Sequence, residues 1–318
     1  MRAPNAGSKM TPRSVEPGQY VFVVCSTGAD YFPEMAAISI ATLRIASPHA
    51  RVCVLTDRET SRLNTAGLSA IRDMADSVTA VDCAADGTLA RSRFLKCNMR
   101  GLVDGPLFYL DSDTIVMQPL DGIWAVDCDV GASPNLGLDG KTYPAAAARN
   151  EIPASLDWTF GPGLYLNAGV IYLADNPAAH RFAEQYRASW REFIAATGRA
   201  NEQFAFNRAL AATETRGAVL PSSYNAQISM NVMALRGARI LHYFSGHFES
   251  SNETVAHVAA KRLRSEGVVD MAALRAEIAS GNPWMQTDSY RKALATGSYW
   301  KAGTLAFTRV RKRLGVAA

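Results

Sequence analysis

Two aspartates stand one residue apart inside an otherwise apolar run. The run covers residues 105–120, GPLFYLDSDTIVMQPL, and the pair is Asp111 and Asp113. Two carboxylates this close repel each other, and the repulsion raises the pKa of one of them unless a cation lies between them. Carboxylate oxygens suit Mg²⁺ and Mn²⁺, and a cation held by few protein ligands keeps positions open for phosphate oxygens. The pair therefore predicts a divalent cation site that binds a diphosphate; the alternative is a pair of turn residues that ends a strand.

The segments around this pair predict an α/β fold. Strands are expected at 20–25, 51–56, 77–83, 105–120, 164–173 and 239–244, and helices at 32–46, 61–74, 91–103, 178–196 and 202–212. Strands that alternate with helical crossovers of a dozen residues or more favour a mostly parallel sheet. Ligands of such sheets bind beyond the carboxyl ends of the strands, where Asp111 and Asp113 are expected to lie.

Composition divides the chain into three predicted parts: a disordered N-terminal tail at 1–18, a catalytic domain at 19–250 and a helical extension with a basic tail at 251–318. Residues 131–163 are rich in Gly, Pro, Ala and Asn and have little periodicity. A connection of this length without regular structure is typical of a functional lid or of a disordered link. The strand at 164–173 is expected to be interrupted by Asn167-Ala168-Gly169.

The charge of the chain is uneven. The 318 residues carry a net charge of +4, yet the last 30, from Ser289 onward, contain seven Lys and Arg and no Asp or Glu. A nucleic-acid-binding protein more often spreads positive charge over a folded face, so no nucleic-acid partner is expected. Apolar residues fall on one side of a helix predicted from Thr304, among the basic ones: Leu305, Phe307, Val310 and Leu314. This pattern predicts peripheral contact with an anionic membrane surface, and the alternative is a solvated, frayed terminus.

The remaining composition is that of a globular protein. No apolar run approaches the ~18 residues of a membrane span. The five cysteines are odd in number and form no CxxC pair, so they are predicted to be buried, reduced thiols. We therefore expect a cytoplasmic protein, in peripheral contact with the inner face of the membrane if the basic terminus binds lipid.

Several motifs together resemble one enzyme family. In chain order they are CSTGADY at 25–31, RFLK at 93–96, YLDSDT at 109–114, LNAGV at 166–170, EQ at 202–203 with Asn207, LP at 220–221 with YN at 224–225, and His242 with Gly246. Over residues 20–246 the chain resembles the retaining GT-A glycosyltransferases of the glycogenin and bacterial lipopolysaccharide galactosyltransferase type, family 8. The resemblance implies a Rossmann-like fold, a nucleotide-sugar donor, which we expect to be a UDP-hexose, and a saccharide or glycolipid acceptor.

The resemblance also implies roles for individual residues. Asp111, Asp113 and His242 would hold Mn²⁺ or Mg²⁺, with His247 as an alternative ligand. Glu202 and Gln203 would lie near the reacting sugar carbon as catalytic residues. Tyr31 would stack on the uracil, and Arg93 and Lys96 would reach the diphosphate, although both basic residues also fit a solvated helix face. The full expected donor-binding set is Asp30, Tyr31, Arg93, Lys96, Asp111, Ser112, Asn167, Ala168, Gly169 and Gly246.

The chain departs from the family pattern at a few positions. Asp30 replaces an Asn, Phe204 replaces an Asp, and Gly246 comes one residue late with no Lys-Pro-Trp after it. These departures keep open a nucleotide-sugar-binding protein without turnover. A phosphatase of the haloacid-dehalogenase type is a further alternative, but it would need Thr or Val where Ile115 stands and an aspartate motif on the first strand.

Overall fold

The computed structural model describes residues 18–137, 140–161, 163–228, 237–243, 254–280 and 298–313, with positions 230, 234, 290, 293 and 294. The strands are β1 (Gln19–Val24), β2 (Arg51–Asp57), β3 (Ser77–Val81), β4 (Leu107–Leu110), β5 (Thr114–Val116), β6 (Val130–Pro134), β7 (Leu166–Leu173), β8 (Gly217–Val219), β9 (Ala226–Gln227) and β10 (Ile240–His242). The helices are α1 (Phe32–Ala46), α2 (Arg58–Ser61), α3 (Ala66–Met74), α4 (Thr88–Asn98), α5 (Pro177–Thr197), α6 (Gln203–Ala212), α7 (Val255–Glu266), α8 (Met271–Ala279) and α10 (Tyr299–Arg313). The predicted tail at 1–18 lies almost wholly outside the described residues.

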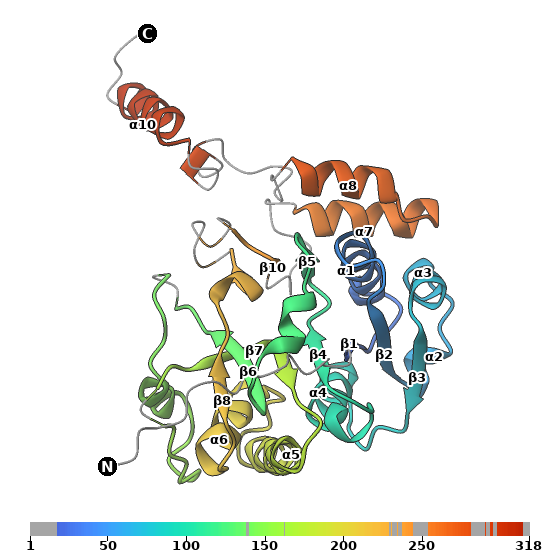
Figure 1. Ribbon diagram of the computed structural model, residues 1–318, viewed down its shortest axis with the longest axis vertical. Helices are drawn as coiled ribbons and strands as arrows, with labels where there is room; N and C mark the ends of the chain where they lie inside the picture. The colour runs from blue at the N-terminus through green and yellow to red at the C-terminus, as the bar shows by residue number, and fades with distance from the viewer. Residues whose placement is uncertain are drawn as a thin grey trace, which may run out of the picture.

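A seven-stranded sheet forms the centre of the molecule, in the order β3-β2-β1-β4-β7-β6-β8, and β5-β10-β9 form a small second sheet (Figure 1). Strands β3, β2, β1 and β4 are parallel. Strand β7 runs antiparallel to β4 and β6, and β8 is parallel to β6. The prediction of an α/β fold with a mostly parallel central sheet is thus confirmed.

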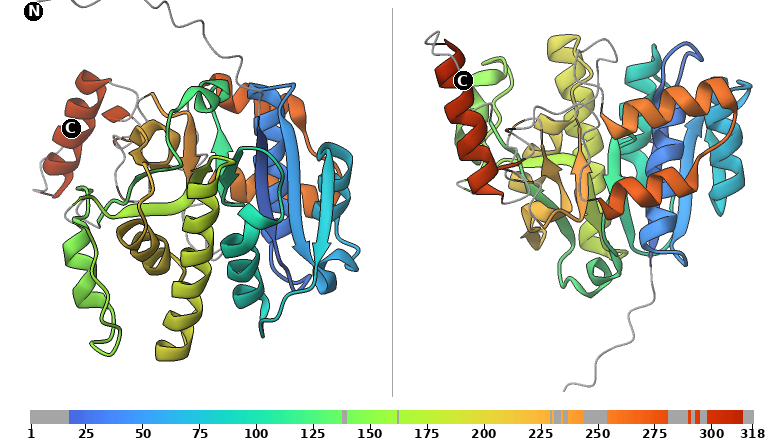
Figure 2. Two further views of the ribbon diagram at one scale, coloured as in Figure 1. Left: turned by 60° about the horizontal axis from the view of Figure 1, so that its bottom comes forward. Right: turned by 90° about the horizontal axis from the view of Figure 1, so that it is seen from above.

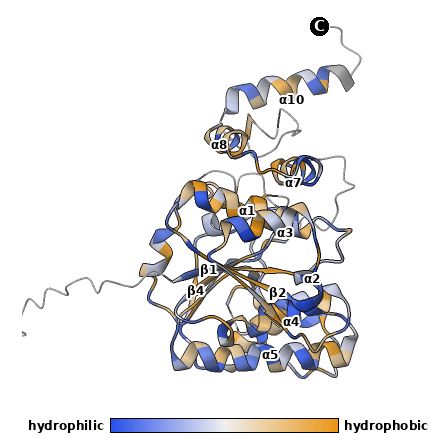
Figure 3. Ribbon diagram, turned by 90° about the vertical axis from the view of Figure 1, so that its right-hand side faces the viewer, coloured by the Kyte–Doolittle hydropathy of each residue, from blue (hydrophilic) through white to orange (hydrophobic). Residues whose placement is uncertain are grey.

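Helices cover both faces of the central sheet (Figure 3). Side chains of a strand alternate between faces, and those of β1 divide between two cores. Tyr20 and Phe22 belong to the core that contains residues of α1, α3, α7 and α8. Val21 and Val23 belong to the core that contains residues of α4, α5 and α6. The C-terminal helices α7 and α8 therefore pack on the core of the α/β body, as the two orange helices in Figure 2 illustrate.

The prediction of an irregular segment at 131–163 is wrong at its start, because β6 lies there. All five residues of β6, Val130-Gly-Ala-Ser-Pro134, are buried, and β6 pairs with β7 on one side and β8 on the other. A strand buried on both faces shows no alternation of apolar and polar residues. Small side chains also suit the close packing, since a Cβ on Gly131 would lie 3.1 Å from a Leu220 methyl group.

Two further strand predictions need correction. The apolar run at 105–120 forms two short strands in different sheets, β4 and β5, with Asp111, Ser112 and Asp113 in the turn between them. Asn167-Ala168-Gly169 does not interrupt its strand but lies within β7, which is continuous and fully buried. Both differences bear on the site, because the turn after β4 lies beside the middle of β7.

Helix boundaries differ from those predicted by a few residues. The helix predicted at 61–74 begins at Ala66, because the Thr65 side chain accepts a hydrogen bond from the Leu68 amide and caps the helix there. The helix predicted at 91–103 begins earlier, at Thr88, and gives way to a 3₁₀ turn after Asn98. Within the described residues, none of the helices combines the length and the apolar character needed to cross a bilayer.

Candidate metal centre and ligand cavity

Three potential metal ligands converge where the two sheets meet. Asp111 and Asp113 flank the turn after β4, and His242 ends β10, which pairs antiparallel with β5 so that His242 lies opposite Thr114. The Nε2 atom of His242 lies 3.2 Å from Asp113 Oδ1 and 3.7 Å from Asp111 Oδ2. One ligand atom from each residue lies within 4.8 Å of the other two. The triad thus comes from segments about 130 residues apart, joined by one strand pair.

A chain of amides fixes the ring of His242. Its Nδ1 lies 2.9 Å from Asn225 Oδ1, the Asn225 amide donates to Asn167 Oδ1 at 2.8 Å, and the Asn167 amide donates to Asn135 Oδ1 at 2.9 Å. An Nδ1–H donated to Asn225 directs the lone pair of Nε2 toward the two carboxylates, which is how a histidine is held for metal binding.

The triad favours positive charge. Burial lowers the pKa of His242, but the carboxylates of Asp113 and Asp111 outweigh this and raise the pKa above its usual value. Two carboxylate oxygens and one imidazole nitrogen are a donor set that suits Mn²⁺ and Mg²⁺. The residues present therefore fit a divalent cation of this class.

The absence of a side chain at Gly169 leaves the space in which Asp111 and His242 lie. The Asp111 amide donates to the carbonyl of Gly169 at 2.8 Å, so the backbone of β7 lies against the turn after β4. A Cβ on Gly169 would lie 2.2 Å from His242 Cε1 and 2.8 Å from Asp111 Oδ2. Any side chain at this position would overlap two of the three candidate ligands.

A buried ionic cluster adjoins the triad. Lys96, only 1% exposed, places its Nζ 3.1 Å from Asp111 Oδ1 and 2.8 Å from Glu202 Oε1. Arg93 lies one turn away on α4, and its Nε is 2.8 Å from Glu202 Oε2. The hydroxyl of Tyr109 donates a short hydrogen bond to Asp111 Oδ1. Lys96 therefore is not part of a solvated helix face, and one oxygen of Asp111 is engaged while the other faces His242.

The cluster keeps Glu202 ionised. Burial alone would raise the pKa of Glu202, but Arg93 and Lys96 outweigh burial and hold the pKa at about 2. Glu202 in turn compensates two cations that would otherwise be costly to bury. The geometry makes Glu202 the group that orients Arg93 and Lys96 beside the triad.

One large cavity, of about 1270 Å³, contains this chemistry. The predicted residues that line it are Asp30, Arg93, Lys96, Asp111, Ser112, Asp113, Asn167, Gly169, Glu202, Gln203 and His242. Ala168 is buried in β7 instead, where its amide donates to Gln203 Oε1 at 3.2 Å. Gly246 and His247 lie outside the described residues.

Tyr31 is also not among the lining residues. The Cζ atom of Arg264 lies over the Tyr31 ring, 3.6 Å from the ring centroid. The neighbouring Phe32 lines the cavity and is 41% exposed. The assignment of Tyr31 as the base-stacking aromatic stays a prediction, and Phe32 is a second aromatic for that role.

Sequence reasoning missed several residues of the site. Tyr109 stands within the YLDSDT segment and Phe32 directly follows the CSTGADY segment, but neither carried a role, and Asn225 stands in the YN pair at 224–225. The only signal in the sequence for these three residues was their position within or next to the motifs. The contact between Asn225 and His242 bridges 17 positions of the chain, so no local pattern reports it.

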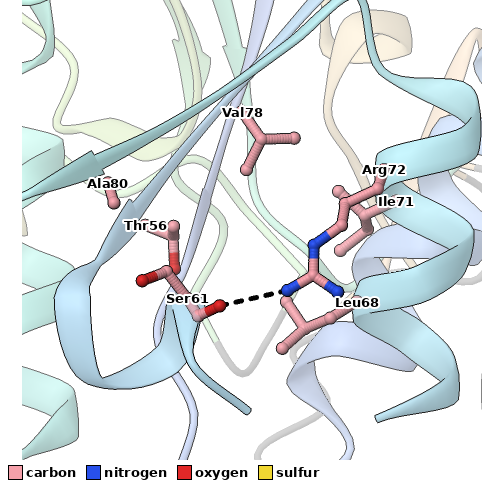
Figure 4. A pocket seen from close by; sticks show the side chains of 7 residues that line it. All are labelled: Thr56, Ser61, Leu68, Ile71, Arg72, Val78 and Ala80. Atoms are coloured by element: carbon pink, nitrogen blue, oxygen red, sulfur yellow. Dashed lines mark hydrogen bonds between the residues drawn. The ribbon is translucent and has the colours of Figure 1, made fainter. Parts of the chain in front are cut away.

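A second pocket, of about 270 Å³, lies between α3 and the strands β2 and β3 (Figure 4). Its single ionisable lining residue, Arg72, donates to the carbonyl of Ser61 at 3.0 Å. The other lining residues are Thr56, Ser61, Leu68, Ile71, Val78 and Ala80. This pocket contains no cluster of acidic or nucleophilic side chains, so the chemistry belongs to the large cavity.

Comparison with known proteins identifies similar folds but no sequence relatives. No family model matches the chain, and no curated protein matches it. The bifunctional glycosyltransferase WbbM, in its apo structure, matches with a TM-score of 0.53 and 16% identity over 85% of this chain and 51% of its own. The galactosyltransferase LgtC, in complex with donor and acceptor sugar analogs, matches with a TM-score of 0.52 and 13% identity over 86% of this chain and 99% of its own. The glycosyltransferase GlyE of Streptococcus pneumoniae TIGR4 matches with a TM-score of 0.51 and 16% identity over 86% of this chain and 66% of its own.

These matches define the class of fold. The chain has the mixed α/β fold of the GT-A glycosyltransferases, with a mostly parallel central sheet. Nearly the whole of LgtC is covered, whereas WbbM extends well beyond the matched region. At these identities the likeness concerns the fold, and membership of family 8 stays a prediction.

Proposed function

We propose that this protein is a metal-dependent glycosyltransferase that moves a sugar from a nucleotide-diphosphate donor to a saccharide or glycolipid acceptor. The observation that carries the proposal is the convergence of Asp111, Asp113 and His242 beside the buried Lys96 in one cavity. A UDP-hexose is the donor that the resemblance favours, and retention of configuration is the stereochemistry.

In this proposal the triad would hold Mn²⁺ or Mg²⁺, and the cation would supply positive charge that stabilises the nucleoside diphosphate as a leaving group. Lys96 and Arg93 add positive charge that is already oriented by Glu202 before any ligand arrives. Because such charges need no reorganisation during the reaction, they stabilise the leaving group more than mobile side chains would.

The state of Glu202 bears on how the configuration is retained. A carboxylate with a pKa of about 2, paired with two cations, is a weak nucleophile. We therefore assign Glu202 to positioning and favour attack by the acceptor on the same side as the leaving group. Gln203 lines the cavity and anchors its Oε1 on the Ala168 amide, so we assign it to contact with the donor sugar.

Ligand-dependent thermal stability tests the donor site. A ligand that binds only the folded protein at about 100 times its Kd adds about 2.7 kcal/mol, which for a chain of this length corresponds to a rise in Tm of roughly 4 °C. We expect one nucleotide sugar to give this rise with Mn²⁺ and to lose it in EDTA. No rise with any nucleotide sugar would reject a donor site. Release of nucleoside diphosphate with Mn²⁺ then separates a transferase from a binding protein, and release of inorganic phosphate alone would favour a phosphatase.

We also propose that α10 lies on an anionic membrane, which would bring the enzyme to a glycolipid acceptor. Its exposed apolar residues, Tyr299, Trp300, Phe307 and Val310, fall within one arc of about 100° at 3.6 residues per turn. Half-buried Arg311 lies beside this stripe, and exposed Lys301 and Arg309 lie on the opposite side of the helix. The stripe differs from the face predicted from sequence, since Leu305 is half-buried. Aromatic residues on one face and cations on the other are typical of interfacial helices.

Vesicle flotation tests the membrane proposal. We expect binding to vesicles with 30% anionic lipid and none to neutral vesicles. Trp300→Ser with Phe307→Ser should weaken binding at least tenfold, because burying one such side chain contributes about 1.5–3 kcal/mol. The control is Val219→Ser on β8, which removes an apolar side chain of similar exposure, 57%. Equal flotation of the double variant and the control would reject α10 as the membrane contact.

A further inference from the structure

We propose that Arg264, on the C-terminal helix α7, is a positioning residue that clamps the cavity-lining loop 26–31 into the shape that receives the donor. This inference rests on the proposed function for the identity of the ligand. It assigns to α7 a part in a site whose other residues, among those that the structure describes, come from the first 242 positions of the chain.

The guanidinium of Arg264 contacts Glu34 of α1 on one side and three residues of the loop on the other. Its Nε and Nη2 donate to the two carboxylate oxygens of Glu34 at 3.2 and 2.7 Å. Nη1 donates to the carbonyl of Ala29 at 3.1 Å, and Nη2 makes a short hydrogen bond to the carbonyl of Asp30. The ring of Tyr31 stacks against its face. Three consecutive loop residues are thus held by one side chain.

The anchor of this clamp is rigid. Glu34 is fully buried in the first turn of α1, and Arg264 is its ion-pair partner at 2.7 Å. Helix α7 packs into the same core as α1 through Val255, Ala256 and Leu263. The guanidinium therefore ties the loop to two helices, α1 and α7, that pack in the same core.

Asp30 organises the loop from inside. Its carboxylate accepts from the Ser26 hydroxyl at 2.7 Å, the Thr27 amide at 2.8 Å and the Phe32 amide at 3.2 Å. Gly28 supplies the turn, with a φ of 85°. Both carboxylate oxygens are engaged within the loop, one of them also by the Thr27 hydroxyl, so Asp30 shapes the segment that lines the cavity through Thr27, Asp30 and Phe32.

The clamp requires an arginine. Only a planar guanidinium offers donors to a carboxylate and two carbonyls at once while its face stacks on a ring. A lysine would keep the charge beside Glu34 but would lose the fork and the stacking surface. Arg264→Lys is therefore expected to behave more like Arg264→Gln than like the wild type.

Two measurements test the clamp, one with donor and one without. In the ligand-free protein, hydrogen exchange at the amides of residues 27–32 should become at least tenfold faster in Arg264→Gln and Arg264→Lys, while amides of α7 stay protected. With donor, KM for the nucleotide sugar should rise about tenfold while kcat changes less than twofold. The control is Arg262→Gln on the same helix, whose ion pairs reach only Glu266 and Asp270 in α7 and its flank, and both measurements should match the wild type.

The possible results test the clamp and the proposed function separately. Unchanged exchange at 27–32 in Arg264→Gln would overturn the clamp, whatever the activity. Faster exchange with an unchanged KM would overturn its part in donor binding. A wild-type protein that neither binds nor turns over any nucleotide sugar would refute the proposed function, and the exchange measurement alone would then decide the clamp.

Discussion

Gly169→Ala is expected to abolish metal-dependent donor binding while leaving the protein folded. The added Cβ would lie 2.2 Å from His242 Cε1 and 2.8 Å from Asp111 Oδ2, closer than real contacts allow. His242 is 3% exposed and tied to Asn225, so it has no open space in which to move away. Overpacking of this kind costs about 1–3 kcal/mol.

The effect on the ligands should exceed the effect on stability. Displacing a single supporting group of a metal ligand costs about 10–100-fold in metal affinity. With two ligands displaced, we expect Mn²⁺-dependent affinity for the nucleotide sugar to fall by about 100-fold or more. Titration calorimetry with Mn²⁺ present measures it. Gly101→Ala is the matched control, because a Cβ there meets nothing within 4 Å. A folded Gly169→Ala protein with wild-type affinity would show that the triad does not serve the ligand.

Lys96→Met should remove activity and also destabilise the protein. The substitution keeps most of the side-chain volume but leaves Glu202 with Arg93 alone and takes the cation away from Asp111. Removing one partner of a buried ion pair costs about 3–5 kcal/mol, because the other charge stays buried. Chemical denaturation measures this loss, and the same preparation should show turnover reduced by at least 100-fold.

A double variant separates the two effects of Lys96. Lys96→Met with Glu202→Gln removes both charges but also leaves Arg93 without its partner, so the double variant should lose less stability than the two single variants added together, while activity does not return. Losses of stability that simply add in the double variant, or activity that returns with it, would contradict the assignment of Glu202 as the partner that orients Lys96.

Acid titration gives an independent measure of the same cluster. The pKa of Glu202 is about 2 in the folded protein and 4.5 in its reference state. A depressed pKa contributes stability that is fully present above about pH 4.5 and is lost as the pH falls toward 2. Glu202→Gln should therefore flatten the stability profile in this window.

The sequence contained the local part of the site. Asp111, Ser112 and Asp113 form a contiguous motif after an apolar strand, so residue types and spacing alone indicated a cation. His242 followed from the order of motifs, and the structure places it in reach of the aspartates through the pairing of β10 with β5. Sequence motifs therefore predict best those functional residues that lie within one short segment of the chain.

The parts that were missed depend on contacts between distant segments. Strand β6 was not recognised because burial on both faces removes the alternation that marks a strand. Asn225 supports His242 through a side-chain hydrogen bond, and Arg264 reaches the loop from 234 positions away. Nothing in the local pattern around Arg264 distinguishes it from Arg262, which is a surface residue of the same helix.

The central claim is that Asp111, Asp113 and His242 hold a divalent cation beside a nucleoside diphosphate. The most direct measurement is an anomalous difference map at the manganese edge, from crystals grown with MnCl₂ and UDP. We expect one strong peak at bonding distance, about 2.0–2.6 Å, from a carboxylate oxygen of each aspartate and from His242 Nε2. That peak should vanish in Asp113→Asn. A nucleotide bound in the cavity with no manganese at the triad would contradict the account.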